Sequence, residues 1–309
     1  MTFDEFINEW RSDASDIEAR TSGSTGEPKL IRLSKTFVRR SAERTNAFFS
    51  ITSGSRLHSC VAADFIGGKM MAVRSDIAGC RFSHELPSNQ PLGSVGKGEV
   101  IDLLAVVPSQ MLHILDHLED MPDLRGIIIG GSAIDDRLRE KIMSSGLNAF
   151  ETYGMTETAS HIALRSVGEG EWFHALDGIH VSLDGRGCLV IEFDSGERVV
   201  TNDLATLQDS CSFKIDGRID HVIITGGKKL NPFEVEKLLS GLIEAPFIIT
   251  SVPDEKWGRR VVLRIEGEPA IQEKELRREM KCILPSWKVP KDIEWVEHLE
   301  RTKNGKLVR

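Results

Sequence analysis

Four hydroxyl side chains and two glycines precede a lysine in the stretch Thr21-Ser22-Gly23-Ser24-Thr25-Gly26-Glu27-Pro28-Lys29. Backbone N–H groups, hydroxyls and one ammonium group together make a favourable environment for a phosphate. The stretch is not a Walker A loop, because that motif needs Gly before the lysine and Ser or Thr after it, whereas Pro28 and Leu30 flank Lys29. We interpret it as a phosphate-binding loop, and a Ser/Gly-rich surface turn is the alternative interpretation.

Apolar runs alternate with helical patterns in the part of the chain that follows this loop. The runs predict strands at residues 59–63, 100–107, 126–129 and 148–153. Apolar residues at three- and four-residue spacing predict helices at residues 34–50, 67–78, 108–118 and 135–145. This alternation predicts a large N-terminal α/β domain.

The pattern changes after Thr156. Short apolar segments separated by turns at residues 184–187 and 194–196 predict an antiparallel β subdomain. From Asp220 onward, a strand, a helix beginning at Asn231-Pro232, two strands around Arg259, a charged helix and a final strand predict a small α+β domain. We therefore expect two domains, at residues 1–219 and 220–309.

Composition excludes several classes of protein. The chain has 309 residues, of which 40% are hydrophobic and 28% charged, as in globular proteins. Its net charge of −8, without blocks of like charge, argues against nucleic acid as a partner. No segment resembles a signal peptide or a membrane helix, so a cytoplasmic protein is expected. The five cysteines are scattered without a CxxC pair, which indicates neither disulfides nor a zinc site, and we expect buried thiols.

The phosphate loop closely resembles the signature of the adenylate-forming superfamily, which includes acyl-CoA synthetases, luciferases and peptide-synthetase adenylation domains. Further motifs of that superfamily occur in the expected order. Residues 151–157 resemble its adenine and magnesium motif. The resemblance implies that Tyr153 stacks on the base and that Glu157 binds Mg²⁺. It assigns nucleotide binding to the loop residues from Thr21 to Gly26, to Lys29 and to Gly131, Ser132, Thr152, Gly154 and Met155, and a catalytic role to Thr156.

The same resemblance implies roles for residues nearer the C-terminus. Asp203 would bind the ribose hydroxyls together with Arg218. Asp220 would be the hinge about which the small domain rotates, carrying Gly226, Gly227 and Lys228 towards CoA. Lys306, in the last motif, would neutralise charge between the reacting carboxylate and the α-phosphate. Outside this resemblance, a lone Asp203 would be interpreted as a turn residue and Lys306 as a surface charge near the terminus.

Two segments carry cues to the acid substrate. Residues 67–74 and 158–165 resemble the 2-succinylbenzoate–CoA ligases of menaquinone biosynthesis. The resemblance implies that Arg74, Lys69, Ser160 and His161 line the acyl pocket. A basic side chain on an apolar helix suits a substrate with a second carboxylate, although an exposed helix arginine is an equally good interpretation of Arg74.

The implied reaction is an AMP-forming ligation of a carboxylic acid to CoA. ATP, Mg²⁺ and CoA are therefore the expected cofactor and substrates, with Glu157 as the metal ligand, and a homo-oligomer is compatible with the sequence. Two alternatives remain open: ligation of another acid or loading of a carrier protein, and a non-catalytic nucleotide-binding subunit. Because 20 residues precede the loop, a member with a shortened N-terminus is expected.

Overall fold

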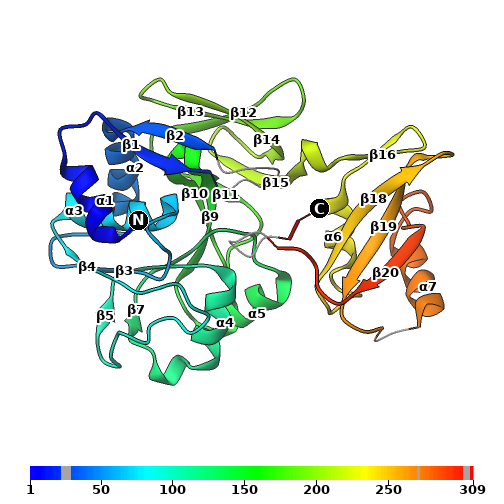
Figure 1. The fold of residues 1–309 in the computed structure, drawn as a ribbon, viewed down its shortest axis with the longest axis horizontal. Coiled ribbons are helices and arrows are strands. Elements are labelled where there is room, and N and C mark those ends of the chain that lie inside the picture. Colours follow the sequence, from blue (N-terminus) through cyan, green and yellow to red (C-terminus); the bar gives the residue numbers. More distant parts are fainter. Residues whose placement is uncertain (22–28, 270–271, 302–306, 309) are drawn as a thin grey trace. The chain divides into compact units, whose positions relative to one another are not determined.

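The computed structural model describes residues 1–21, 29–269, 272–301 and 307–308. The chain divides into two compact units (Figure 1). The first comprises Met1–Val181, Glu192–Val199 and Gln208–Phe213, and the second comprises Ser182–Ile191, Val200–Leu207 and Lys214–Arg309. The second unit takes in the whole of the expected small domain together with segments that precede it. The domain boundary at Asp220 stays a prediction.

A mainly parallel sheet forms the centre of the first unit. The strands lying wholly in this unit are β1 Asp16–Arg20, β2 Leu30–Ser34, β3 Arg56–Ser59, β4 Arg81–His84, β5 Val100–Ile101, β6 Leu103–Val106, β7 Asp123–Leu124, β8 Ile127–Ile129, β9 Ala149–Met155, β10 Ser160–Ser166 and β11 Phe173–Ala175. Seven of them follow the order β11-β10-β9-β8-β6-β3-β4. Neighbours from β9 to β4 are parallel, and β10 is antiparallel to β9 and β11. This confirms the predicted α/β architecture.

Helices of the first unit pack on that sheet. They are α1 Phe3–Arg11, α2 Lys35–Phe48, α3 Ile66–Ala78, α4 Pro108–Asp116 and α5 Asp136–Ser145, with 3-10 turns η1 Leu118–Asp120 and η2 Thr156–Thr158. The Ser34 and Asp135 side chains cap α2 and α5, and Gly79 and Gly146 end α3 and α5 at φ of +63° and +73°, where glycine is unstrained. The four helices predicted in this region are confirmed.

One predicted strand is misplaced. A strand was expected at residues 59–63 because Cys60, Val61, Ala62 and Ala63 are apolar, but β3 ends at Ser59. The true strand contains His58 and Ser59, both with no exposed surface. A central parallel strand is covered on both faces, so the usual alternation of apolar and polar residues is absent from it.

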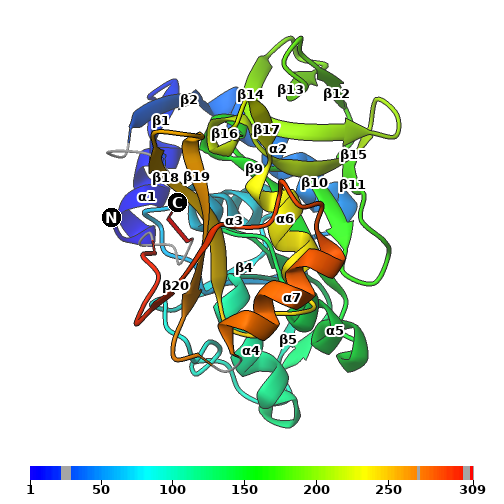
Figure 2. The ribbon, with the colours of Figure 1, turned by 90° about the vertical axis from the view of Figure 1, so that its right-hand side faces the viewer.

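Four antiparallel strands contribute residues to both units: β12 Ile179–Leu183, β13 Cys188–Phe193, β14 Arg198–Leu207 and β15 Ser212–Arg218. The rest of the second unit contains η3 Ile219–His221, β16 Ile223–Thr225, β17 Lys228–Leu230, α6 Pro232–Leu239, β18 Phe247–Asp254, β19 Gly258–Glu266, α7 Glu273–Ile283 and β20 Asp292–Val296. Helices α6 and α7 share one apolar core with the β18-β19-β20 sheet (Figure 2). Two strands, β16 and β17, precede α6 where one was expected, and the rest of the predicted order of this α+β segment is confirmed.

The expectation of five buried thiols is only partly correct. Cys60 and Cys188 are buried and Cys80 is half-buried, but Cys211 and Cys282 are exposed. All five are free. Across the described residues, the helices are too short or too polar to cross a membrane.

Candidate active site

The predicted phosphate loop begins and ends at two residues that are held together. Strands β1 and β2 are antiparallel, and Arg20 pairs with Leu30. The Thr21 N–H donates to the Lys29 carbonyl at 2.9 Å, and the Lys29 N–H donates to Thr21 Oγ1 at 3.0 Å. Both residues therefore take fixed positions at the end of this hairpin. Ser22, Gly23, Ser24, Thr25 and Gly26 lie outside the described residues.

The predicted adenine and magnesium motif spans the end of β9 and the turn η2. Strand β9 carries Thr152, Tyr153, Gly154 and Met155, and η2 carries Thr156 and Glu157. A Cβ on Gly154 would lie 2.2 Å from the Ser160 carbonyl oxygen, so only glycine permits this approach of β10. The Glu157 side chain is exposed, whereas Thr156 is buried. An exposed carboxylate on this short turn is accessible to a divalent cation such as Mg²⁺.

A second glycine segment lies beside that motif. Strands β8 and β9 are parallel neighbours, with Ile129 opposite Glu151, so Gly131 and Ser132 leave the sheet at the same edge as Gly154. Gly131 has φ of +91°, a conformation that favours glycine. Ligands of open α/β sheets bind at the carboxyl ends of the strands. The geometry therefore gathers the predicted residues of the first unit at such an edge.

Tyr153 contributes an aromatic ring at this edge. The ring is half-buried and lies 5.1 Å from the Phe213 ring in an edge-to-face arrangement and 5.9 Å from the Phe173 ring. The Thr152 hydroxyl donates to the Ile129 carbonyl at 3.2 Å. Tyr153 is thus supported by two aromatic rings while remaining partly accessible to a ligand.

Arg74 is fully buried in helix α3. Its Nη2 lies 3.5 Å from His161 Nδ1, its Nη1 lies 3.5 Å from Met71 Sδ, and its Nε has no hydrogen-bond partner among the described residues. Burial lowers the pKa of Arg74 to about 9, so the guanidinium remains charged at neutral pH. Among the described side chains no carboxylate forms an ion pair with it. A buried charge without a counter-ion is unfavourable. The full burial of Arg74 excludes the alternative interpretation of this residue as an exposed helix arginine.

His161, on β10, connects Arg74 to helix α2. His161 Nε2 lies 2.9 Å from Thr45 Oγ1, and the Thr45 hydroxyl donates to the Ser41 carbonyl at 3.3 Å. This network assigns the proton to Nε2 and leaves Nδ1 as the acceptor for Arg74. Burial and the charge of Arg74 lower the pKa of His161 well below its ordinary value, so the imidazole is neutral. Thr45 was not predicted from the sequence, because nothing in its helical pattern marks it as buried.

Lys69 and Ser160 have different environments. The Lys69 ammonium is buried, donates to the Glu18 carbonyl at 2.7 Å and lies 4.7 Å from the centre of the Phe6 ring. Burial lowers its pKa, against the opposing effect of Glu9, Asp64 and Glu18. These contacts fix Lys69 to the N-terminal segment, and a substrate role for it remains a prediction. Ser160 is half-buried with φ of +80°, and its carbonyl accepts the Thr158 hydroxyl at 2.7 Å.

In the second unit, three predicted residues lie together. Arg218 donates through Nη1 to Asp203 Oδ1 at 3.1 Å and through Nη2 to Asp220 Oδ2 at 2.9 Å. The Asn202 amide donates to both Asp220 carboxylate oxygens, at 3.2 and 3.1 Å. Burial alone would raise the pKa of Asp220, but the hydrogen bonds from Arg218 and Asn202 lower it. The sequence order alone did not indicate that Asn202 bonds to the predicted hinge.

Gly226 and Gly227 form the two-residue turn between β16 and β17. Their φ angles are +53° and +77°, as a tight hairpin turn requires. The Lys228 ammonium lies 5.0 Å from the centre of the Trp287 ring. The predicted catalytic Lys306 lies outside the described residues. Its role, like those of Gly226, Gly227 and Lys228, stays a prediction.

Comparison with known proteins identifies the family. The family described as AMP-binding enzyme matches residues 21–199. The chain is similar to an acyl-CoA synthetase (AMP-forming)/AMP-acid ligase II-like protein of Dyadobacter fermentans, with 30% identity, a TM-score of 0.65, and coverage of 98% of this chain and 90% of that one.

Two further relatives are named for a single acid. A 2-succinylbenzoate–CoA ligase of Bacillus cereus is 25% identical, over 94% of this chain and 68% of its own length. The o-succinylbenzoate CoA synthetase (MenE) of Bacillus subtilis, in complex with its acyl-adenylate intermediate, has a TM-score of 0.81 at 21% identity, covering 96% of this chain and 68% of its own. MatB of Rhodopseudomonas palustris, with bound ATP, also has a TM-score of 0.81, at 19% identity, covering 94% of this chain and 66% of its own. The fold is therefore shared by proteins with different names.

Proposed function

Because this chain belongs to the AMP-binding enzyme family and is an AMP-forming acid–CoA ligase, we propose that 2-succinylbenzoate is the acid it activates. The reaction has two steps. A carboxylate oxygen of the acid attacks the α-phosphorus of ATP, and pyrophosphate leaves to give an acyl adenylate. The CoA thiol, losing its proton, then attacks the acyl carbon, and AMP leaves. Adenylation is needed because direct attack of a thiol on a carboxylate would have to expel oxide.

The first step requires stabilisation of charge on the phosphates. The loop that begins at Thr21 and ends at Lys29 supplies hydroxyl and ammonium donors, and preorganised donors of this kind lower the barrier electrostatically. The exposed Glu157 carboxylate fits a hard cation and would hold Mg²⁺. Bound Mg²⁺ would supply charge neutralisation at the phosphates. Lys306 would add its positive charge to those of Lys29 and Mg²⁺ in this step only.

Other residues would orient the adenine and ribose of the nucleotide. Tyr153 would offer a ring face to adenine, supported from behind by Phe173 and Phe213. Asp203, held by Arg218, would accept hydrogen bonds from the ribose hydroxyls. These assignments rest on the positions of the side chains and on the family to which the chain belongs.

The observation that carries the choice of acid is Arg74. Its guanidinium has no exposed surface, and its nearest polar contacts are a neutral imidazole and a thioether. 2-Succinylbenzoate has an aromatic carboxylate besides the succinyl carboxylate that reacts. An aromatic carboxylate beside Arg74 would supply the missing counter-ion, and the pair would be desolvated together. An acid with one carboxylate leaves Arg74 without a counter-ion.

Arg74→Ala tests this choice in a comparison of two acids. Loss of one member of a buried pair typically costs about 3–5 kcal/mol, so kcat/KM for 2-succinylbenzoate should fall by about 10²–10³-fold or more. For 3-benzoylpropionate, which lacks the aromatic carboxylate, the decrease should be far smaller. The difference between the two decreases isolates the contact. Equal decreases for both acids would show that Arg74 is structural and would remove the support for this substrate.

Arg74→Lys serves as the matched variant. Lysine keeps the charge but lacks the planar pair of N–H donors, so an intermediate decrease for 2-succinylbenzoate is expected. A second experiment measures pyrophosphate release by the unaltered chain with each of a panel of carboxylic acids. Faster turnover of another acid in that screen would keep the ligase activity and reject the substrate.

A further inference from the structure

A cluster of metal-ligating side chains lies at the carboxyl ends of strands β3 and β4, and it contains none of the predicted nucleotide and acyl residues. These strands are parallel, with His58 opposite Ser83 and Ser59 opposite His84. Side chains alternate between the faces of a strand, so His58 shares a face with Cys60, and Ser83 shares it with Glu85. The register therefore places imidazole, thiol and carboxylate groups on one face. In the sequence, Glu85 is far from His58 and Cys60, so the sequence did not indicate that the three side chains lie together.

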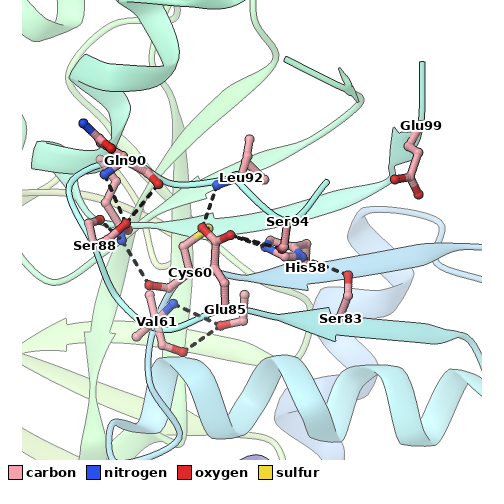
Figure 3. A network of polar contacts seen from close by, with 12 residues as sticks. His58, Cys60, Val61, Ser83, Glu85, Ser88, Gln90, Leu92, Ser94 and Glu99 are labelled. Atoms are coloured by element: carbon pink, nitrogen blue, oxygen red, sulfur yellow. Dashed lines mark hydrogen bonds and ion pairs between the residues drawn. The ribbon is translucent and has the colours of Figure 1, made fainter. Parts of the chain in front are cut away.

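The three side chains point towards one another (Figure 3). One ligand atom from each residue lies within 4.8 Å of the other two. Cys60 Sγ lies 3.4 Å from Glu85 Oε1, and His58 Nε2 lies 3.9 Å from Glu85 Oε2. His58 and Cys60 are almost completely buried, with exposed fractions of 0% and 1%, and the Glu85 side chain is 13% exposed.

One atom in the cluster has no hydrogen-bond partner. His58 Nδ1 contacts Ser83 Oγ at 2.8 Å, but the buried Nε2, which lies on the side of Glu85, makes no hydrogen bond within the described residues. Buried polar atoms are nearly always satisfied, so a partner for this one is expected. Neither the proposed ligase reaction nor the packing of the sheet uses it. The lone pair of Nε2 is therefore available to a ligand.

We propose that His58, Cys60 and Glu85 bind a Zn²⁺ ion. Imidazole, thiolate and carboxylate are the protein ligands of zinc, at distances of about 2.0–2.3 Å. Tetrahedral ligands at those distances lie about 3.3–3.8 Å from one another. The observed separations need only small side-chain movements to reach this range. A thiolate and an imidazole select zinc over the hard cations Mg²⁺ and Ca²⁺.

Charge balance also favours a dication. Zinc ligation requires a neutral imidazole from His58 and a thiolate from Cys60, beside the carboxylate of Glu85. When Zn²⁺ binds, the Cys60 proton leaves to solvent and a thiolate–zinc bond forms. The two anionic ligands then neutralise the ion.

The ion would join two parts of the chain. Glu85 accepts the Leu92 N–H at 2.6 Å and the Ser94 hydroxyl at 3.2 Å, so it already anchors the segment that follows β4. Zn²⁺ would fix this segment to β3, which lies inside the sheet. Three protein ligands leave a fourth position for water, as in zinc sites that remain open. The inference is independent of the proposed substrate.

The test uses the full chain, stripped of metal and titrated with Co²⁺ and Zn²⁺. We expect one Co²⁺ per chain with a thiolate-to-cobalt charge-transfer band, displaced by one equivalent of Zn²⁺. Zn²⁺ should raise the midpoint of thermal unfolding. Cys60→Ser, which keeps a hydroxyl donor for Glu85, should lose the band and weaken Zn²⁺ binding by more than about 100-fold.

Two further variants distinguish this site from metal binding elsewhere on the chain. Cys211→Ser removes an exposed thiol that lies 3.9 Å from His180 and should leave the band unchanged. Glu85→Gln retains an acceptor for the Leu92 N–H while losing the charge, and it should weaken Zn²⁺ binding even if Cys60→Ser fails to fold. The proposal is overturned if the unaltered chain shows no thiolate band, if the band disappears in Cys211→Ser, or if Glu85→Gln binds Zn²⁺ as tightly as the unaltered chain.

Discussion

His161, beside the buried Arg74, should make the stability of the folded chain depend on pH. The pKa of His161 in the folded chain lies well below 6.5, because of burial and the neighbouring Arg74 charge. Below pH 6.5 the unfolded chain therefore binds a proton that the folded chain does not, and stability falls as the pH decreases. As the pH decreases, the free energy of unfolding should fall less steeply in His161→Gln than in the unaltered chain. The two slopes should differ by up to about 1.4 kcal/mol per pH unit.

Urea unfolding of both proteins at about pH 7.5 and about pH 5 measures this difference. His58 has a lowered pKa as well, so the comparison between the two proteins, rather than either profile alone, isolates His161. Parallel profiles would mean that His161 is protonated in the folded chain.

Arg218 is expected to matter for nucleotide binding more than for stability. Its side chain is 35% exposed, and ion pairs at such positions contribute less than about 1 kcal/mol to stability. Arg218→Ala should therefore leave the urea midpoint nearly unchanged while raising the Kd for ATP by about tenfold or more. Arg198→Ala, which removes an exposed ion pair with Glu192, is the control and should alter neither quantity. A normal Kd in Arg218→Ala would reject the ribose assignment.

The residue types at these sites could be predicted from the sequence, but their burial could not. Arg74 was equally well interpreted as a surface residue, since helix periodicity alone does not show which neighbours cover a side chain. Thr45 and the cluster around His58 depend on contacts between residues far apart in the chain. No local pattern predicts such contacts.

Strand β9 and the turn after it depend on one glycine. A Cβ at Gly154 would lie 2.2 Å from the Ser160 carbonyl oxygen, which belongs to the backbone and cannot rotate away. Gly154→Ala should lower the free energy of unfolding by about 1–3 kcal/mol and displace the turn carrying Glu157. Pyrophosphate release should fall in consequence.

Gly168→Ala is the matched control, because a Cβ there would have no neighbour within 4 Å and the glycine does not have a positive φ. Unfolding curves and pyrophosphate release should be unchanged in it. If Gly154→Ala behaved like this control, β10 would have to be free to shift.

Among the elements, helices of the first unit were predicted more accurately than its strands. Several of their ends are marked locally, since Ser34 and Asp135 cap the starts of α2 and α5, Pro108 begins α4, and Gly79 and Gly146 end α3 and α5. Strand β3 was misplaced because the apolar residues after it resemble a strand, whereas its own His58 and Ser59 do not. Burial on both faces, which decides the matter, is a property of the assembled sheet.

Across the whole molecule, the two half-reactions should respond differently to Lys306→Ala. The resemblance of residues 301–306 to the superfamily motif implies that this lysine acts in adenylate formation only, with the thioester step following a predicted rotation about Asp220. We expect adenylate formation to be lost while a supplied acyl adenylate is still converted to the CoA thioester. Each half-reaction is measured separately, by pyrophosphate release and by thioester formation. Equal loss in both would contradict the assignment.

Product analysis with two acids is the sharpest test of the ligase reaction and of its substrate together. The full chain is incubated with ATP, Mg²⁺, CoA and 2-succinylbenzoate, and the nucleotides and thioesters are separated and quantified. We predict AMP, pyrophosphate and one CoA thioester in equal amounts, with far less product from 3-benzoylpropionate. Formation of ADP, or AMP without any thioester, or equal product from both acids, would refute this prediction.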